Sequence, residues 1–335
     1  MSYLLAPLTS GKLHLKNRLI MPPMATAKAE TNGQVNSALL DYYQEKSAGG
    51  YLSLVIIEHS YIQIEGKASE NQLSVADGST VLGLEKLAAT IHANGVKTVM
   101  QLNHAGSAAD PAITGSEAVG PSAILNPRKG GIPRELTPIE ISAIVAAFGD
   151  AALRVKQAGF DGVEIHSAHG YLLNQFLSPL TNQRTDEYGG SLLNRIRIHL
   201  QVIKAVRAAV GNEFPIFLRL GAADFTAGGT TIEDSQLAAV EFEKAGVNIL
   251  DISGGFCGYT LADHTEPGYF APLTAAMKQV VAIPVILTGG IIAVQAAEQL
   301  LAQGKADLIG VGRALLKNSH WAQLAVETLQ KKETL

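Results

Sequence analysis

Short apolar runs alternate with longer amphipathic segments along almost the whole chain. The runs have the length and the β-branched content of buried strands, and we predict eight of them, at 19–21, 52–57, 96–102, 162–165, 215–220, 247–252, 284–287 and 306–310. The segments between them predict helices at 37–48, 80–94, 138–158, 191–210, 231–245, 271–280 and 294–303, and a last helix opens at 313–316. The connection from 103 to 138 has no such pattern, which is typical of a functional or disordered loop.

This alternation predicts an α/β fold. Eight strand–helix repeats favour a closed (β/α)8 TIM barrel, formed by residues 1–335 as a single domain. The alternative is an open, doubly wound sheet, but no G-x-G-x-x-G motif follows the first strand. In a barrel the carboxyl ends of all strands meet on one face. The residues that we expect on that face are Pro23, Met24, Glu58, His59, Gln101, His166, Arg219, Gly289, Gly290, Gly312 and Arg313.

Composition excludes several classes of protein. Lys plus Arg is 26 against 30 for Asp plus Glu, so the basic footprint of a nucleic-acid-binding protein is missing. The single cysteine, Cys257, excludes an intramolecular disulfide, a Cys-rich zinc site and a four-cysteine iron–sulfur cluster. No apolar run approaches the ~18 residues of a membrane span and the N-terminus does not look like a signal peptide, so we expect a cytoplasmic protein without membrane contact. Charged residues are only 17%, which leaves surface Ala and Leu for contacts in a homo-oligomer.

Two imidazoles and a phenol follow the fourth predicted strand, as His166, His169 and Tyr171. A buried polar group without a partner costs ~1–3 kcal/mol, and the carboxyl end of a barrel strand is the usual catalytic location. We interpret the imidazoles as donors to a substrate oxygen that becomes an enolate. Tyr171 is interpreted as the proton donor, because a phenol with a pKa near ~10 stays protonated at neutral pH. The alternatives are polar residues that pin the loop and a metal site, but H-E-x-x-H is absent and we predict no metal.

The last two strands predict a phosphate site. Gly289 and Gly290 follow the seventh strand, and Gly312 and Arg313 lead from the eighth strand into a helix. Bare backbone N–H groups and a guanidinium beside a positive helix end bind phosphate in many barrels. The alternative is that these glycines only allow tight turns.

Two polar residues stand in otherwise apolar strands. Arginine is seldom buried without an anion to pair with. We therefore expect Arg219 to pair either with a core acid such as Glu164 or Asp251 or with a cofactor that gains negative charge on reduction. The amide of Gln101 offers a donor and an acceptor, which matches a heterocycle edge with C=O and N–H groups. A polar residue satisfied at a strand end is the alternative for Gln101.

Five stretches carry a resemblance to a known family. They are HSAHGYLLNQFLSPLTNQRTDEYGGSLLNR at 166–195, LKNRLIMPPM at 15–24, QLNHAG at 101–106, FLRLGAADF at 217–225 and GVGRALL at 310–316. Over nearly the whole chain the sequence resembles the old yellow enzyme family of FMN-dependent oxidoreductases. The resemblance implies a TIM barrel with non-covalent FMN that takes hydride from NADH or NADPH. It further implies reduction of the C=C bond of an enone, enal or nitroalkene, which is the activity of an ene-reductase.

The resemblance also implies roles for individual residues. Those implied to line the flavin are Pro23, Met24, Gln101 and Arg219, and Ala25 stands where the family often has Thr or Cys. Those implied to hold the phosphate are Gly289, Gly290, Gly312 and Arg313. His166 and His169 are implied to bind the substrate oxygen, and Tyr171 to protonate Cα.

Two other activities stay open at this point. One is an FMN-dependent NAD(P)H oxidase, or a reductase of quinones or partner proteins, that has no preference for enones. The other is a metal-dependent barrel hydrolase. For His59 and the loop 256–259 two interpretations stay open, additional substrate contacts and ordinary loop residues, and we favour the second.

Overall fold

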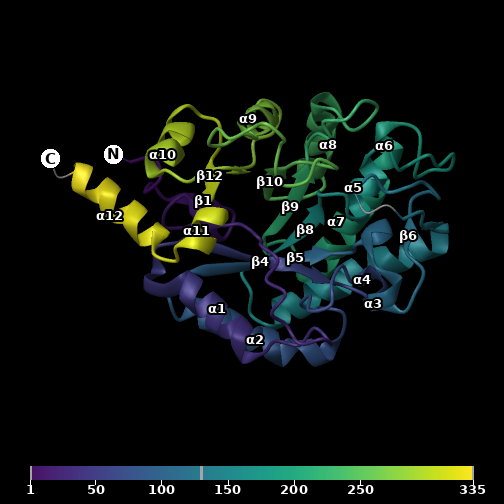
Figure 1. The fold of residues 1–335 in the computed structure, drawn as a ribbon, viewed down its shortest axis with the longest axis horizontal. Coiled ribbons are helices and arrows are strands. Elements are labelled where there is room, and N and C mark those ends of the chain that lie inside the picture. Colours follow the sequence, from purple (N-terminus) through teal and green to yellow (C-terminus); the bar gives the residue numbers. More distant parts are fainter. Residues whose placement is uncertain (1, 129–130, 334–335) are drawn as a thin grey trace.

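A closed barrel of eight parallel strands forms the centre of the protein (Figure 1). The structure is a computed structural model and describes residues 2–128 and 131–333. The strands follow one another around the barrel as β3 (Leu19–Met21), β4 (Leu54–Tyr61), β5 (Lys97–Asn103), β8 (Gly162–Ser167), β9 (Ile216–Gly221), β10 (Ile249–Ser253), β11 (Val285–Thr288) and β12 (Leu308–Gly310). The prediction of a TIM barrel is therefore confirmed, and the open sheet is excluded because β12 pairs with β3.

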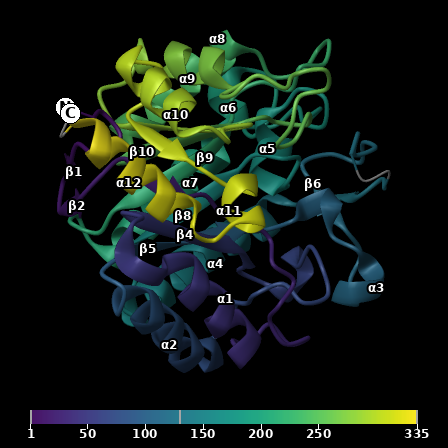
Figure 2. The same ribbon diagram turned by 60° about the vertical axis from the view of Figure 1, so that its left-hand side comes forward.

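Helices cover the outside of the barrel. The long ones are α1 (Ser37–Ser47), α2 (Val81–His92), α4 (Pro138–Gln157), α7 (Arg197–Val210), α8 (Ile232–Lys244), α9 (Ala271–Lys278), α10 (Val294–Ala302) and α12 (Trp321–Glu333). Figures 1 and 2 show α1 and α2 on one side of the strands and α8, α9 and α10 on the opposite side. The start of α4 follows from its sequence, since Thr137 and Glu140 form a capping box and Pro138 takes the first turn.

A hairpin closes the amino-terminal end of the barrel. Strands β1 (Leu8–Ser10) and β2 (Leu13–Leu15) pair antiparallel. Leu13 and Leu15 are buried against the side chains that fill the barrel interior, among them Ile20, Val99 and Phe217. We did not predict this hairpin, because runs of three residues are too short to show an alternating pattern. The site face must therefore be the other end of the barrel.

Several predicted boundaries are wrong. β4 runs on to Tyr61, so Glu58 and His59 lie inside the strand rather than after it. The predicted helix 191–210 is two helices, α6 (Leu192–Arg195) and α7, because Ile196 has ψ near 0°. The last helix is also two, α11 (Arg313–Lys317) and α12, because Asn318 is extended. No helix in the described ranges is long and apolar enough to cross a membrane.

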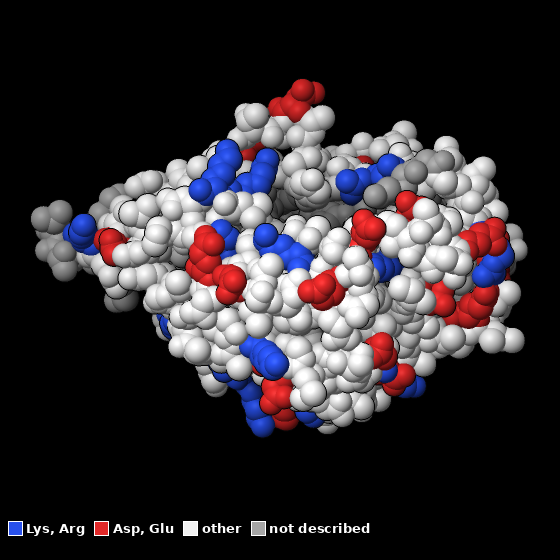
Figure 3. Space-filling view, turned by 60° about the horizontal axis from the view of Figure 1, so that its bottom comes forward, with Lys and Arg blue, Asp and Glu red and all other residues white. Residues whose placement is uncertain are grey.

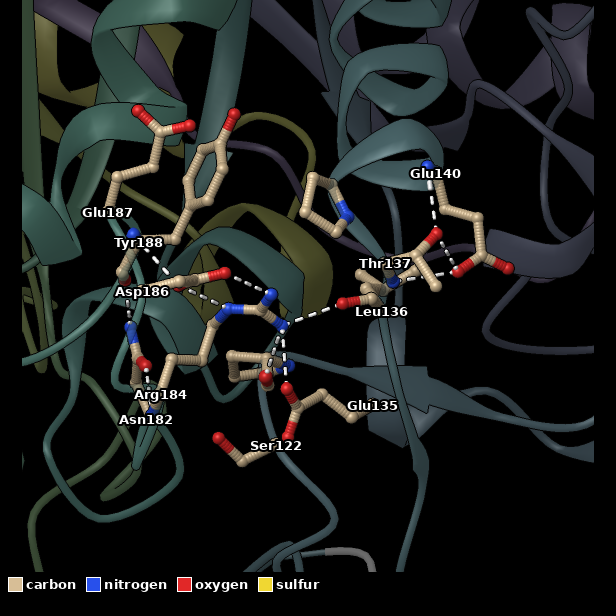
Figure 4. Close-up of polar contacts among 12 residues, drawn as sticks. Ser122, Glu135, Leu136, Thr137, Glu140, Asn182, Arg184, Asp186, Glu187 and Tyr188 are labelled. Carbon is tan, nitrogen blue, oxygen red and sulfur yellow. Dashed lines mark hydrogen bonds and ion pairs between the residues drawn. The ribbon is translucent and has the colours of Figure 1, made fainter.

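In its described parts, up to residue 128 and from residue 131 on, the long connection after β5 contains short elements of secondary structure. It contains η4 (Gly106–Ala108), α3 (Pro111–Thr114), β6 (Val119–Gly120) and β7 (Arg134–Glu135). The buried Arg184 fixes this segment to the chain that follows β8 (Figure 4). Its Nη1 donates to the carbonyl oxygens of Pro121 at 2.8 Å and Leu136 at 2.7 Å, and its Nε and Nη2 pair with Asp186. Much of the 166–195 motif therefore serves to hold the loops over the barrel.

Candidate active site

Three rings meet at the carboxyl end of β8. His166 lies near the end of that strand, and Tyr171 is the N-cap residue of α5 (Leu172–Leu177). The turn between them is tight, with positive φ angles of 62° at His169 and 75° at Gly170. The ring of His166 is 5.1 Å from that of His169 and 5.1 Å from that of Tyr171, both edge-on. The structure thus brings together all three residues that we predicted to be catalytic.

The two imidazoles are held neutral and differ in their partners. Burial lowers the pKa of His166 well below its ordinary value, and His169 and Arg219 lower it further. Burial and then Arg219 lower the pKa of His169 in the same way. Nε2 of His169 lies 2.8 Å from the hydroxyl oxygen of Ser253, whereas the buried Nδ1 of His166 has no hydrogen-bond partner within residues 2–128 and 131–333. An unpartnered buried nitrogen at this place is suited to a ligand oxygen.

Tyr171 is protonated at neutral pH. Burial raises the pKa of its phenol above the ordinary value, and the opposing effect of Arg128 is smaller. Arg128 reaches over from the long connection, and its Nη1 donates to the carbonyl oxygen of His169 at 2.9 Å. The phenol can therefore serve as a proton donor, with a fixed positive charge nearby.

Polar groups line the carboxyl end of the barrel interior below the three rings. Nε2 of Gln101 donates to Oε1 of Glu164 at 2.7 Å, while Oε2 of Glu164 has no partner. Nε of Arg219 is 3.2 Å from Oδ2 of Asp251, so the core-acid alternative for Arg219 is observed, with Asp251 rather than Glu164. Among the described residues, neither Nε of Arg219 nor Oδ2 of Asp251 has a partner at hydrogen-bonding geometry, so both atoms can still form a hydrogen bond with a ligand. Burial raises the pKa of Asp251 to about 6, despite the opposing effect of Arg219.

The predicted phosphate residues also come together. Gly289 and Gly290 have φ angles of 142° and 64°, which L side chains rarely adopt, and a Cβ at Gly289 would lie 2.8 Å from the ring of Tyr269. Nη2 of the exposed Arg313 donates to the hydroxyl of that same Tyr269 at 3.2 Å. The turns after β11 and β12 therefore both contact the side chain of Tyr269.

The first loop lies beside Gly312, one of the residues predicted to bind phosphate. A Cβ at Gly312 would be 3.1 Å from the sulfur of Met24, so the backbone at Gly312 packs against that side chain. Pro23 and Met24 are half-buried and Ala25 is exposed. The strand order explains the contact, since β12 and β3 are neighbours in the barrel.

Sequence reasoning missed or underrated several residues. His59, which we interpreted as an ordinary loop residue, has its ring 5.3 Å from that of Tyr171. Tyr259 has its ring 6.0 Å from that of His169. Ser253, Arg128 and Tyr269 were not predicted at all. A serine at the end of a buried strand was a readable signal for Ser253, but nothing local marks the other two.

Other features of the described residues do not compete with this site. Burial raises the pKa of Cys257 to about 11, which leaves a protonated and poorly nucleophilic thiol. Within 2–128 and 131–333, no group of three or more His, Cys, Asp or Glu has a geometry that could hold a metal ion. A surface cavity of ≈ 430 Å³ between α1 and α11–α12 contains none of the predicted site residues.

Charged side chains are mixed over the face shown in Figure 3. Lys and Arg lie near Asp and Glu, so no patch of one sign covers this face. The same view shows a hollow with Lys and Arg side chains at its edge.

Comparison with known proteins now assigns the family. The sequence profile of the NADH:flavin oxidoreductase / NADH oxidase family matches residues 3–332. The chain is 41% identical over 328 residues to an NADH oxidase of Thermoanaerobacter brockii, covering 96% of this chain but only 50% of that relative. It is 38% identical over 314 residues to an NADPH dehydrogenase of Clostridium acetobutylicum, covering 93% of this chain and 91% of the relative.

A solved structure agrees with the sequence relatives. The old yellow enzyme homologue of Zymomonas mobilis superimposes with a TM-score of 0.85 at 26% identity, covering 97% of this chain and 92% of that one. The cofactors of this enzyme type are FMN and a nicotinamide that supplies hydride. The chain spans about half the length of the first of these relatives, and it belongs to the NADH:flavin oxidoreductase / NADH oxidase family, with the barrel of the old yellow enzymes.

Proposed function

We propose that this protein is an ene-reductase, which uses NADH or NADPH to reduce the activated C=C bond of α,β-unsaturated carbonyl or nitro compounds. The observation that supports it most is the arrangement of His166, His169 and Tyr171. At the carboxyl end of the barrel, the neutral imidazole of His166 has its ring 5.1 Å from the neutral imidazole of His169 and 5.1 Å from the protonated phenol of Tyr171. An oxidase that only passes electrons to O2 does not need a proton donor held beside two hydrogen-bond donors for a carbonyl or nitro oxygen.

The residues at the barrel mouth fit FMN. The ring system would meet the amide of Gln101 and the guanidinium of Arg219, beside a Glu164 oxygen that has no protein partner. The first-loop residues Pro23, Met24 and Ala25 would cover its edge. Gly289, Gly290, Gly312 and Arg313 would hold the phosphate, close to a buried Thr288 hydroxyl that also has no partner. FMN, when bound, would supply the redox chemistry, the transfer of a hydride equivalent from the nicotinamide to Cβ of the substrate.

The three rings would then act on the substrate in two ways. His166 and His169 would each donate one N–H hydrogen bond to the carbonyl or nitro oxygen, and so stabilise the negative charge that develops there. Because both imidazoles are neutral, each has one proton, and its position in the ring matters. The hydroxyl of Ser253 donates to Nε2 of His169 in the tautomer that leaves the proton on Nδ1 for the substrate. Tyr171 would give its proton to Cα, which completes the addition of two hydrogen atoms across the double bond.

A stopped-flow experiment in the absence of oxygen tests the proposal. The purified protein with FMN is first mixed with NADH or NADPH, and the bleached enzyme is then mixed with cyclohexenone. We expect the flavin absorbance to be lost in the first step and to return in the second. If the reduced enzyme is reoxidised by oxygen or by a quinone but not by any enone, the protein is an oxidase or a quinone reductase instead. The relative named NADH oxidase makes that outcome the one to exclude.

Two further predictions concern the protein as a whole. We expect a homo-oligomer, because the charged fraction of 17% leaves apolar surface for subunit contacts. We also expect a location in the cytoplasm. Light scattering of the purified protein and cell fractionation test these two points.

A further inference from the structure

A layer of polar side chains lies above the apolar side chains that fill the barrel. The members of this polar layer are Gln101 on β5, Glu164 on β8, Arg219 on β9 and Asp251 on β10. Three of the four follow an apolar interior residue by two positions along their strand, and so they face the interior too. All four are buried, and the two acids have no exposed surface. The layer thus holds two carboxyl groups away from water.

Arg219 is the cation of the polar layer, and it lies beside Asp251. Its Nε is 3.2 Å from Oδ2 of Asp251, and the two residues are also partners in the register of β9 and β10. Within residues 2–128 and 131–333, no cationic side chain lies within ion-pair distance of Glu164. The guanidinium can compensate one carboxylate, and its position assigns it to Asp251.

The hydrogen bonds of Glu164 suit a protonated carboxyl group. Nε2 of Gln101 donates to Oε1 of Glu164 at 2.7 Å, and Oε2 has no partner among the described residues. An ionised carboxylate only accepts, so when it is buried it needs a cation or several donors. A protonated carboxyl group needs fewer, because one oxygen accepts and the other carries the O–H. The unpartnered Oε2 is the place for that proton.

The electrostatics of the polar layer agree with these contacts. Burial raises the pKa of Glu164 well above its ordinary value, and the charge of Asp251 raises it further, whereas the opposing effects of Arg219 and of the Gln101 hydrogen bond are smaller. Burial raises the pKa of Asp251 only to about 6, because Arg219 opposes it. His166, two positions beyond Glu164 on β8, is neutral and adds no charge.

We propose that Glu164 is held as a neutral carboxylic acid, so that the polar layer has no net charge and can accept an FMN that becomes negative on reduction. The charges of Arg219 and Asp251 then cancel within the layer. An ionised Glu164 would instead place an uncompensated negative charge in the barrel interior, which would oppose reduction of the cofactor. Because Glu164 would act on the flavin potential, the inference does not depend on which substrate reoxidises the enzyme.

Two substitutions test which of the two acids is charged. Glu164→Gln and Asp251→Asn each replace a carboxyl group by a neutral amide of nearly the same shape. The measured quantity is the dissociation constant of oxidised FMN divided by that of reduced FMN, obtained without oxygen at pH 7. A rise in this ratio is a rise in the potential of the bound flavin. Glu85→Gln, exposed on α2, is the control and should leave the ratio unchanged.

The expected ratios differ sharply between the two variants. Glu164→Gln exchanges one neutral group for another and should stay within about twofold of the wild type. Asp251→Asn leaves Arg219 without its counter-charge and should raise the ratio at least ~10-fold, which is ~30 mV for a two-electron couple. A comparable rise in Glu164→Gln would show an ionised Glu164 and overturn the inference. An unchanged ratio in Asp251→Asn would overturn it as well, because charge in the layer would then not act on the flavin.

Infrared spectroscopy gives a readout that needs no variant to fold. In wild-type holoenzyme labelled with carbon-13 at the glutamate carboxyl group, we expect an isotope-shifted band of a protonated carboxyl group at pH 8. Among the described residues Glu58 is the other buried glutamate, and with a pKa of about 7 it is mostly ionised at that pH. The band should be absent from Glu164→Gln. A wild-type spectrum without the band, or a band that persists in Glu164→Gln, would overturn the inference.

Discussion

The hydroxyl oxygen of Ser253, at the end of β10, lies 2.8 Å from Nε2 of His169 in the turn after β8, although the two residues are far apart in the sequence. Because burial and Arg219 keep His169 neutral, the contact links the tautomer of the ring to the orientation of the hydroxyl, which donates to Nε2 when the ring proton is on Nδ1. In the proposed function Ser253 is a positioning residue, which would act on the substrate through His169.

Removal of the Ser253 hydroxyl should weaken substrate binding without affecting flavin reduction. In Ser253→Ala, Nε2 of His169 loses its hydrogen-bond partner, so the ring is less firmly oriented, and we expect kcat/KM for cyclohexenone to fall ~3- to 10-fold through a higher KM. The rate of flavin reduction by the nicotinamide, measured by stopped flow, should stay the same. Ser253→Thr keeps the hydroxyl and should restore much of the loss. Equal losses in both half-reactions would argue for a general structural role.

The phenol of Tyr171 should matter only in the second half-reaction. Tyr171→Phe keeps the ring contacts with His166 and His59 but removes the acidic proton. We expect flavin reduction to proceed normally and enone reduction to slow by ~10²–10⁴. Stopped-flow measurement of each half-reaction separates the two effects. If both slow equally, Tyr171 does not donate the proton.

Arg219 should control the binding or the potential of FMN. Arg219→Ala removes the positive charge beside Gln101 and Glu164 and leaves Asp251 without its ion-pair partner. We expect the purified variant to lose FMN on gel filtration or to show a lower flavin potential. Arg219→Lys keeps the charge and should lie between the two proteins. Normal flavin content together with a normal potential in Arg219→Ala would remove this assignment.

Glu58 should make stability depend on pH. Burial raises the pKa of this carboxyl from 4.5 to about 7, although hydrogen bonds from Thr26 oppose the shift. The folded protein then binds the proton more tightly than the unfolded chain does, so the free energy of unfolding falls as pH rises from 4.5 to about 7. The full loss is at most ~3 kcal/mol.

The variant Glu58→Gln cannot lose a proton and isolates this effect. We expect Glu58→Gln to raise the melting temperature relative to the wild type at pH 8 and to change it little at pH 4.5. Glu85→Gln, on the exposed side of α2, serves as the control and should be neutral at both values. A Glu58→Gln shift that is the same at both pH values would show that Glu58 does not titrate in this range.

Arg184 should hold the long connection in place. In Arg184→Ala the carbonyl groups of Pro121 and Leu136 and the carboxylate of Asp186 lose their partner, and we expect a loss of roughly 3–5 kcal/mol in unfolding free energy. Arg134→Ala removes a more exposed ion pair with Glu140 and should cost at most ~1 kcal/mol. Chemical denaturation measures both, and limited proteolysis should cut Arg184→Ala first between 103 and 138. Similar losses in the two variants would contradict the anchoring role.

The sequence was sufficient for the barrel and for much of the site, for a common physical reason. Parallel strands buried on both faces are nearly continuous apolar runs, so all eight were readable, and a polar side chain at the end of such a run stands out. His166 and Arg219 were found in this way, and the ring contacts of His166 follow from the turn that the local sequence imposes.

The remaining features depend on contacts that no local pattern records. Ser253 meets His169 only because β8 and β10 lie near each other in the closed barrel. His59 lies where the register of β4 shifts against β5, between Ile57 and Ser60, and the residues 52–61 alone do not specify this shift. Arg184 was part of a recognised motif, yet its role as an anchor appears only once the connection 103–138 is in place.

The hairpin of β1 and β2 also has a consequence for kinetics. Leu13 and Leu15 pack against the side chains that fill the barrel interior, so the amino-terminal end gives no access to the candidate site, and we expect both reactants to bind at the opposite end. The nicotinamide and the alkene would compete for the same site there, and one would have to leave before the other binds. Such an enzyme obeys a ping-pong scheme, with parallel lines in double-reciprocal plots and inhibition by excess of either reactant.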